Sequence, residues 1–359
     1  PFTVRGLPLL LLLWMIFSSC CSTATDGRPW FVIVSTSRYW HNYRHESNAL
    51  LMYRAAKAGG IPDDRIILLL AESYACDPRN VYRGWTFGAS DTARSLNVGD
   101  VDSDSIDYCD PAIVDGQGPM VTAATFLQVL TGRLPMDSPN SLKLDSNCNS
   151  TVVVYLTGHS GEGFMKFQDA EFLTQRDMAH AVASMRQLGR FQRLLFVVDT
   201  CKAASLTDEM ATIPGVVTMA SSDTASNSLS HVEHNHEFIG NALVDEFTFE
   251  FSDALRRRRS SSPSRRRGAG SLKDLFDDAK RGGKIQSFPV IGGAARLQSL
   301  PFEVFFPMGE SRKACGRSIT PHGRLQTISH RGKVESKRCI LLSCWVELPR
   351  TSPPFRVVA

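Results

Sequence analysis

The sequence predicts an α/β protein with a mostly parallel sheet and helices on both faces. Two apolar runs, 151–156 and 194–198, are rich in β-branched and aromatic side chains, and the segment between them, 174–189, has apolar residues at helical spacing. A right-handed crossover places the two strands of such a strand–helix–strand unit side by side. The expected architecture is a three-layer sandwich around one sheet.

The rest of the body continues the alternation of strand and helix patterns. Gly59 and Gly60 follow the first helical pattern, as expected at a helix C-terminus. The last helical pattern has an apolar residue about every four positions and is strongly amphipathic. The elements expected outside the central unit are strand 30–34, helix 47–58, strand 66–71, helix 121–133, strand 215–222 and helix 238–255.

Reactive side chains follow both strands of the central unit. His159 lies in the segment 157–161, next to Gly158, and Cys201 closes the segment 199–201. Because the carboxyl ends of strands line the ligand crevice of an α/β sheet, we expect the two side chains to meet at one rim. A lone cysteine is more often a small buried apolar residue. Here the cysteine follows one strand of the unit and a histidine next to glycine follows the other, which favours a nucleophile with its base.

Other polar residues are expected at the same rim. The loop after strand 30–34 makes Asn42, Arg44 and His45 candidates for orienting a base or holding a substrate. An equally good interpretation is a hydrogen-bonded loop that leads into a helix. Ser221 and Ser222 either line a pocket for a small side chain or are ordinary serines at the end of a strand.

Composition and charge are those of a globular protein that does not bind nucleic acid. The chain has 359 residues, 43% of them hydrophobic, and a formal net charge of +4. Many of the arginines lie beyond residue 255, so the body has no basic face of the kind that binds nucleic acid. Residues 256–270 form an Arg/Ser-rich low-complexity segment, which predicts a disordered insertion and, less strongly, a contact with anionic lipid.

The amino end has the layout of a secretory signal peptide. Arg5 precedes an apolar core over 7–17, and small residues follow through Ala24. The core is too short to span a bilayer comfortably. We therefore expect residues 1–25 to be a signal peptide, incomplete at its start, and the body to lie in the endoplasmic reticulum lumen or beyond.

The polar segment 72–120 contains a cysteine and a group of acidic residues. Cys76 lies in a turn-rich stretch, where a disulfide explains it better than packing does. A weak structural calcium site with Asp63 and Asp107 as oxygen ligands is an expectation, although a solvated acidic loop is favoured over it. The acidic residues of this loop are Asp100, Asp102, Asp104, Asp107 and Asp110.

Two blocks of the sequence closely resemble the catalytic motifs of one family, the catalytic subunits of GPI-anchor transamidases, which belong to the caspase-like and legumain-like cysteine peptidases. The blocks are 156–169, LTGHSGEGFMKFQD, and 194–201, LLFVVDTC. Further segments are similar to the family in the same order, so the resemblance covers about residues 30–255 with a trace over 271–276. These further segments are 37–45, 75–80, 129–135, 220–223 and 228–231.

The resemblance implies a caspase-like catalytic domain over 26–255 and a mechanism. Cys201 would be the nucleophile, His159 the base, Asn42 the residue that orients the histidine, and Cys76 the cysteine that bridges to another subunit. The family cleaves the carboxyl-terminal signal of a proprotein through a thioester and transfers the new carboxyl group to the ethanolamine amine of the GPI lipid. No cofactor is required for this chemistry, and backbone N–H groups near Gly158 and Cys201 are candidates for the oxyanion hole.

The resemblance also implies partners and a location. The partners would be the other subunits of a membrane complex, proproteins and the GPI lipid, and the location the endoplasmic reticulum lumen, with membrane association through the complex. The sequence departs from the family in three ways: Ser160 stands where a second glycine is usual, the Arg/Ser-rich insertion is added, and residues 281–359 contain no apolar span of transmembrane length. We assign residues 271–359 to an extension of unclear fold.

Two other functions are consistent with parts of the sequence. A legumain-like asparaginyl endopeptidase shares the fold and the dyad but hydrolyses the thioester. An inactive scaffold subunit would have lost the dyad, whereas His159 and Cys201 are both present.

Overall fold

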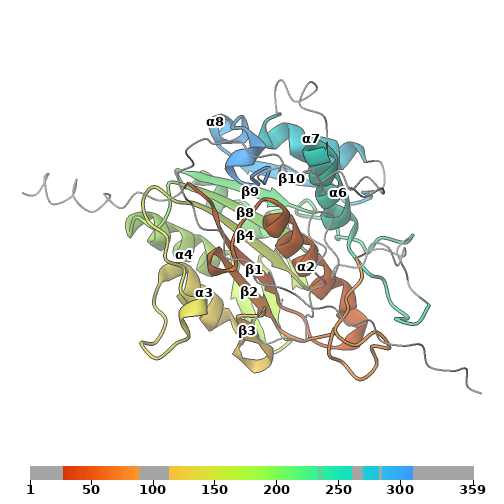
Figure 1. Ribbon diagram of the computed structural model, residues 1–359. Coiled ribbons are helices and arrows are strands. Elements are labelled where there is room, and N and C mark those ends of the chain that lie inside the picture. The colour runs from red at the N-terminus through yellow and green to blue at the C-terminus, as the bar shows by residue number, and fades with distance from the viewer. Residues whose placement is uncertain are drawn as a thin grey trace, which may run out of the picture. The chain divides into compact units, whose positions relative to one another are not determined.

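A seven-stranded sheet forms the centre of the protein (Figure 1). The computed structural model describes residues 27–88, 113–233, 235, 237–260, 270–282 and 285–309. The strand order is β10-β9-β8-β4-β1-β2-β3, and every neighbouring pair is parallel except β10 with β9. This confirms the predicted, mostly parallel sheet. The strands are β1 Trp30–Ser35, β2 Ile66–Leu70, β3 Gly116–Gln117, β4 Thr151–Thr157, β8 Arg193–Asp199, β9 Val216–Ala220 and β10 Val290–Gly293.

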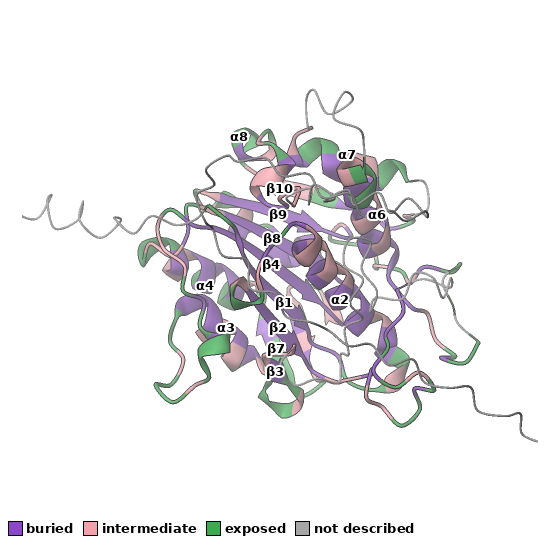
Figure 2. Ribbon diagram, in the orientation of Figure 1, coloured by how far each residue is buried: buried purple, intermediate pink, exposed green. Residues whose placement is uncertain are grey.

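Helices cover both faces of the sheet and make three layers. Successive side chains of a strand point to opposite faces, so Val32 and Val34 join one core while Phe31 and Ile33 join the other. The first core is shared with α3, α4 and α5, and the second with α2, α6 and α7. Figure 2 shows buried strands between helices whose outer sides are exposed. The helices are α2 Tyr43–Ala58, α3 Ala123–Thr131, α4 Gln175–Gln187, α5 Ala204–Thr207, α6 Glu246–Ser260, α7 Leu272–Arg281 and α8 Ala295–Gln298.

The strand register aligns the carboxyl ends of three neighbouring strands. Thr157 of β4 pairs with Ser35 of β1 on one side and with Asp199 of β8 on the other. The residues that follow these strands therefore leave the sheet at the same edge. This places His159 and Cys201 two residues beyond a paired position, as the sequence predicted.

A small antiparallel sheet follows His159, in a region for which we predicted no strands. It has the order β5-β6-β7, with β5 Ser160–Gly161, β6 Phe164–Phe167 and β7 Glu171–Thr174. Glycines and short polar turns interrupt these strands, so they lack a clear alternating pattern. The sheet leads into α4, whose start is fixed by a capping box between Thr174 and Asp177. Short 3-10 helices span Trp40–Asn42, Asp63–Arg65, Gly118–Met120, Asn140–Leu142, Met210–Thr212 and Phe302–Val304.

Helix α6 lies later in the chain than we predicted. It runs from Glu246 to Ser260 rather than over 238–255, so its last turn includes the first four arginines of the expected disordered insertion. Arg258 pairs with Asp278 of α7, and Arg259 donates hydrogen bonds to two backbone carbonyls. These partners explain why the arginines continue the helix. Residues 261–269 lie outside the described part of the chain.

The catalytic fold also continues beyond residue 255, where we expected it to end. β10 pairs antiparallel with β9 through residues 290–293, and Phe276, Phe302 and Phe306 are buried in the second core. The strand has only four residues, two of them glycine, which explains why the sequence pattern did not reveal it. The expected signal peptide and residues 310–359 lie outside the described residues. Within the described ranges, no helix is both long and apolar enough to cross a membrane.

Candidate active site

The loop after β4 places His159 at the sheet edge. Gly158, which precedes it, has φ +155 and is packed so tightly that a Cβ would collide with the Thr36 hydroxyl after β1. Only glycine fits there, because both the backbone conformation and the space exclude a side chain. The loop can therefore turn beside β1 and present the imidazole to its neighbours.

Asn42 fixes the orientation of the His159 ring. Its Oδ1 lies 2.8 Å from Nε2 of His159, and its Nδ2 donates to the carbonyl of Arg38 at 2.6 Å. Because the Asn42 amide donates on one side, its oxygen is the atom that accepts from Nε2–H, which leaves Nδ1 to accept a proton. Burial, and then the nearby Arg44 guanidinium, lower the pKa of His159 below its usual value. The imidazole is thus neutral, as a general base must be.

His45 packs against His159 and is too buried to contact a substrate. The two rings meet edge to face with centroids 4.9 Å apart, and His45 is only 2% exposed. Its Nδ1 lies 2.8 Å from the Ser37 hydroxyl. Burial, followed by the charge of Arg44, holds the pKa of His45 well below its ordinary value, so this ring is neutral too. The burial of His45 behind His159 does not fit the substrate contact that we predicted for it.

A buried carboxylate, Asp245, lies beneath the segment 40–48, which we call the α2 entry. Arg44 Nε donates to its Oδ1 at 3.0 Å, and Asn48 Nδ2 donates to its Oδ2 at 2.6 Å. Burial outweighs the attraction of Arg44 and raises the pKa of Asp245 to about 7. The Arg44 side chain is 20% exposed. Its predicted role in substrate binding stays a prediction, while its bond to Asp245 gives it a structural role as well.

Cys201 is half-buried at the same edge as His159. It is the one free cysteine of the described residues, and its thiol donates to the carbonyl of Ser228 at 3.9 Å. Burial raises the pKa of the Cys201 thiol, which the bond to Ser228 partly offsets. The thiol and the imidazole are therefore both neutral at rest. Hydrogen bonds between such groups often tighten only when substrate binds.

Ser221 and Ser222 support the nucleophile from below and do not line a substrate pocket. Both are fully buried. Ser221 Oγ accepts from the N–H of Thr200 at 3.0 Å, and both hydroxyls donate to the Thr200 carbonyl, at 3.1 and 2.8 Å. Of our two interpretations, this burial fits ordinary serines at the end of a strand better than pocket residues, because both side chains bond to residues 199–202, which we call the nucleophile turn.

Asp199, which begins the nucleophile turn, positions the acceptor of the thiol proton. Its Oδ1 accepts from the Ser228 hydroxyl at 2.7 Å and its Oδ2 from Thr248 at 2.5 Å. Ser228 is thereby held with its carbonyl toward Cys201. The sequence analysis included Asp199 only as part of the segment 199–201 and did not single out Thr248 or Asp245. Their signal is weak, because each lies far along the chain from the residue it supports.

The predictions for Cys76 and for calcium have different outcomes. Cys76 is disulfide-bonded in the structure, and its predicted bridge to another subunit stays a prediction. Asp63 accepts from Tyr53 at 2.8 Å and from Lys57 at 2.9 Å, and Asp107 lies outside the described residues. The described ranges contain no group of three side chains that could hold a metal ion.

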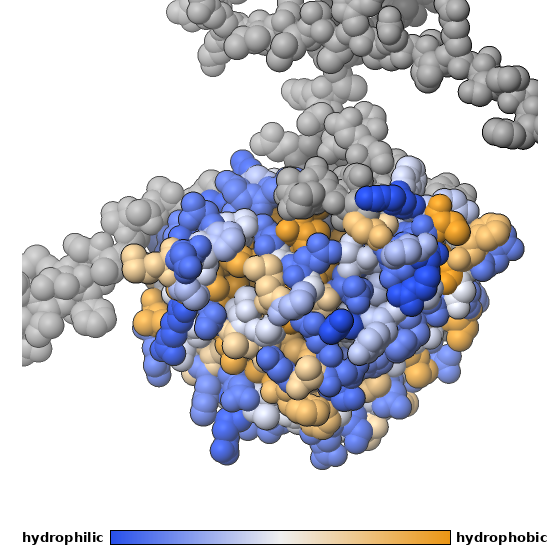
Figure 3. All heavy atoms as spheres, turned by 90° about the horizontal axis from the view of Figure 1, so that it is seen from below, coloured by the Kyte–Doolittle hydropathy of each residue, from blue (hydrophilic) through white to orange (hydrophobic). Residues whose placement is uncertain are grey.

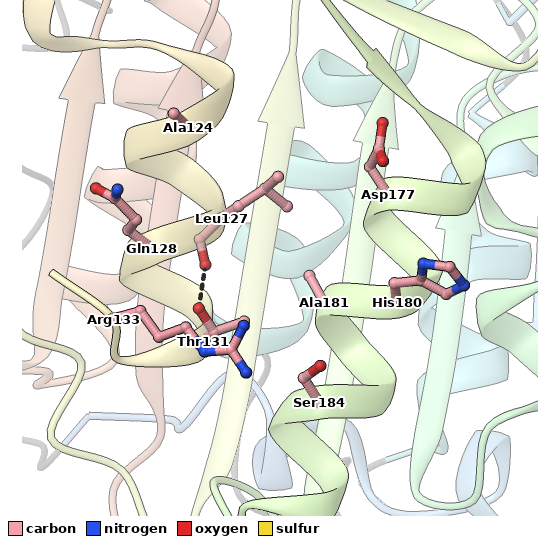
Figure 4. Close-up of a pocket in the computed structure, with 9 residues that line it drawn as sticks. All are labelled: Ala124, Leu127, Gln128, Thr131, Arg133, Asp177, His180, Ala181 and Ser184. Carbon is pink, nitrogen blue, oxygen red and sulfur yellow. Dashed lines mark hydrogen bonds between the residues drawn. The ribbon is translucent and has the colours of Figure 1, made fainter.

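A second hollow in the described part of the chain lies away from the sheet edge. Figure 3 shows hydrophilic and hydrophobic residues interspersed over the visible part of one face. A hollow of about 370 Å³ lies between α3 and α4, lined by residues of both helices such as Arg133, Asp177 and His180 (Figure 4). Its lining includes neither Cys201 nor His159. The candidate active site is therefore the sheet edge.

Comparisons with known proteins point to one family. The sequence model described as Peptidase C13 family matches residues 29–282. The chain is similar to the GPI-anchor transamidase of Schizosaccharomyces pombe, with 39% identity over 251 residues that cover 70% of this chain and 62% of the relative. The GPI-anchor transamidase of Bos taurus is 38% identical, over 78% of this chain and 69% of the relative. The GPI-anchor transamidase of Homo sapiens is 40% identical, over 69% of this chain and 58% of the relative.

The match thus spans roughly three fifths of the length of most of these curated relatives. Among solved structures, the chain is similar to the crystal structure of caspase-1 from Spodoptera frugiperda, with a TM-score of 0.40 and 7% identity. That similarity covers 74% of this chain and 86% of the caspase chain.

Proposed function

Because this chain belongs to the peptidase C13 family, we propose that it is a cysteine-dependent GPI-anchor transamidase subunit. The relatives that carry this name are 38–40% identical to the chain over its folded body. The observation that carries the proposal is the placement of Cys201 and the Asn42-bound His159 at one sheet edge. A nucleophile and an oriented base are the two groups that acyl transfer requires.

The first half of the reaction forms a thioester. His159 Nδ1 takes the proton of the Cys201 thiol as sulfur attacks the carbonyl carbon of the scissile peptide bond. When the tetrahedral intermediate collapses, the carbon–nitrogen bond breaks and His159 returns the proton to the leaving amine. Backbone N–H groups near Gly158 and Cys201 would stabilise the oxyanion, an effect worth about 3 kcal/mol per donor in other enzymes.

The second half transfers the acyl group to an amine. The ethanolamine amine of the GPI lipid attacks the thioester carbon, His159 accepts the proton of that amine, and the released thiolate regains a proton. The products are an amide and the original thiol, so no oxidant, reductant or cofactor enters the balance. A structural calcium ion stays a separate prediction, independent of these steps.

The partners and the location are part of the same proposal. The substrate would be a proprotein with a carboxyl-terminal signal, and the acceptor a GPI lipid. Such a reaction needs a luminal site next to a membrane, which the other subunits of a complex would supply. The relatives' names support a GPI-anchoring role, and the expected signal peptide supports entry into the endoplasmic reticulum.

Complementation tests the proposed function. The full chain replaces the catalytic subunit in a conditional cell line, and surface display of a GPI-anchored reporter is measured at matched expression. We expect the intact chain to rescue display, Cys201→Ala and His159→Ala to abolish it, and His180→Ala to behave like the intact chain. His180 is an exposed histidine of α4 in the hollow away from the site, and so is a matched control. Rescue by either dyad variant would contradict the assignment.

A second measurement separates transfer from legumain-like hydrolysis. The complex is supplied with a signal-bearing peptide and with hydrazine as a small amine acceptor. A transamidase yields the hydrazide at the expense of the free acid, and the yield rises with hydrazine concentration. A hydrolase yields the acid at every hydrazine concentration, which would favour the asparaginyl endopeptidase.

A further inference from the structure

The hydroxyl of Ser160 connects the histidine loop to the nucleophile turn. Ser160 follows His159 directly, is half-buried, and begins β5. Its Oγ donates to the carbonyl of Cys201 and lies 2.7 Å from Oγ1 of Thr200, which donates to it. The Thr200 hydroxyl also lies 2.7 Å from the carbonyl of Gly158. Two side-chain hydroxyls thus link the loop after β4 with the turn after β8.

The peptide unit that Ser160 contacts has an uncommon conformation. It joins Cys201 to Lys202, and Lys202 has φ +50, in the left-handed region that non-glycine residues seldom adopt. Such a residue costs on the order of 1 kcal/mol and persists where neighbouring contacts hold it. The unit is held at both ends, because its carbonyl accepts from Ser160 and its N–H donates to the carbonyl of Ser226 at 2.7 Å.

The other hydroxyls of the nucleophile turn act on different peptide units. Ser221 bonds both the N–H and the carbonyl of Thr200, and Ser222 bonds that carbonyl and the N–H of Ala203. Of these three serines, only Ser160 reaches the carbonyl of the nucleophile itself. Removing its hydroxyl would leave that carbonyl without this donor and the Thr200 hydroxyl with the Gly158 carbonyl as its acceptor, while the strands and the bonds of Ser221 and Ser222 stay in place.

We propose that Ser160 is a positioning residue, whose hydroxyl fixes the Cys201–Lys202 peptide plane and thereby holds the thiol in line with His159. The role rests on the proposed function of this dyad. Because Ser160 is half-buried, water can replace its hydroxyl in the bond to Cys201, so the cost to folding is small. The cost to catalysis is larger, because small displacements of a nucleophile lower the rate steeply.

The test compares Ser160→Ala, Ser160→Gly and Ser160→Thr in the full chain. Iodoacetamide alkylation of Cys201 is followed by mass spectrometry of the peptide that contains it, and kcat and KM of acyl transfer are measured in the assembled complex. We expect the Ala and Gly variants to lower the alkylation rate and kcat about tenfold with KM unchanged. The Thr variant keeps a hydroxyl on the same carbon and should restore both rates to within about twofold.

Two controls separate positioning from folding. Ser299→Ala removes a hydroxyl that donates to a helix carbonyl at 2.9 Å in α8, and should leave both rates unchanged. Thermal unfolding of each variant reports the loss of stability, which should be equally small for Ser160→Ala and Ser299→Ala. Wild-type alkylation and kcat in both the Ala and Gly variants would overturn the proposal. If the wild-type chain does not transfer acyl groups, the proposed function fails, yet the alkylation rates still decide the role of Ser160.

Discussion

The nucleophile turn (199–202) and the α2 entry (40–48) reach the same sheet edge but are held by different forces. The backbone of the nucleophile turn is bonded mainly by neutral hydroxyls, those of Ser160, Ser221 and Ser222. The α2 entry is tied to the buried carboxyl of Asp245 through a guanidinium and an amide. One region is held by bonds that do not titrate, and the other by a group whose pKa is raised to about 7.

The two regions therefore have different roles at the site. Neutral hydrogen bonds hold the backbone of the nucleophile turn, and the Asp199 carboxyl, whose pKa burial raises, acts on Cys201 through Ser228. The charged cluster under the α2 entry sets the electrostatic surroundings of His159, because the Arg44 charge contributes to the low pKa of the imidazole. We therefore expect substitutions of the hydroxyls that hold the turn to act equally at all pH values, and substitutions in the cluster to act in a pH-dependent way.

Arg44→Leu should have the largest effect on stability. It leaves the buried Asp245 without its cation, a change that typically costs about 3–5 kcal/mol. The folded-state pKa of Asp245, about 7, is above the value near 4 of an unfolded chain, so this carboxyl favours folding at low pH and the benefit is lost as the pH rises through 7. Without Arg44, the loss of folding stability with rising pH is larger. The difference in Tm between wild type and variant should widen from pH 5 to pH 8.

The control for this prediction is the same substitution in an Asp245→Asn background. The amide cannot ionise, so the difference in Tm caused by Arg44→Leu should no longer widen toward pH 8, and only the influence of Arg44 on the pKa values of His159 and His45 should remain, at the acid end. An effect of Arg44→Leu that does not vary with pH in the wild-type background would show that Asp245 is not the group that couples the α2 entry to pH.

Ser221→Ala should have a smaller effect that is constant with pH. It removes two hydrogen bonds to Thr200 and leaves the buried N–H of that residue without its acceptor, at a cost of about 1–3 kcal/mol. Urea denaturation at pH 5 and pH 8 should give the same loss in the free energy of unfolding, because neither partner titrates. A loss that differs between the two pH values by more than the error would break the proposed contrast.

Lys202→Gly should have the smallest effect, and it should be stabilising. Glycine adopts φ +50 without the strain of a Cβ, and relief of this strain stabilises the fold by on the order of 1 kcal/mol. Part of this gain is offset because glycine gives the unfolded chain more conformational entropy. The matched variant Lys202→Ala removes the weak contact with Glu162 but keeps the Cβ, and should leave stability unchanged. Equal Tm values for the two variants would show that the turn is not strained at this residue.

The sequence was sufficient to predict the central sheet and the placement of His159 and Cys201 at one edge of it. Parallel strands buried on both faces give continuous apolar runs, and the ends of adjacent strands share an edge. The geometry also agrees with the role of Asn42, one of three candidates from the loop after strand 30–34 and the one to which the family resemblance gave this role. These predictions succeeded because they depend on chain order and on short local patterns.

The sequence could not predict which way side chains point or which distant residues support them. Ser221 and Ser222 were placed correctly at a strand end, but their burial depends on the turn that packs against them. Asp245 begins no motif and reaches Arg44 across about two hundred residues of sequence. β10 joins the sheet through its backbone, so its two glycines carry no periodic signal.

The most direct test of the account is to trap the acyl-enzyme. The assembled complex is mixed with a signal-bearing peptide without an acceptor amine, quenched in acid, digested and examined by mass spectrometry. The account predicts the mass of the acyl group on the peptide that contains Cys201, its loss on addition of hydrazine, and little of it in His159→Ala. Turnover of the substrate with no acyl group on Cys201, or with the group on another residue, would contradict the account.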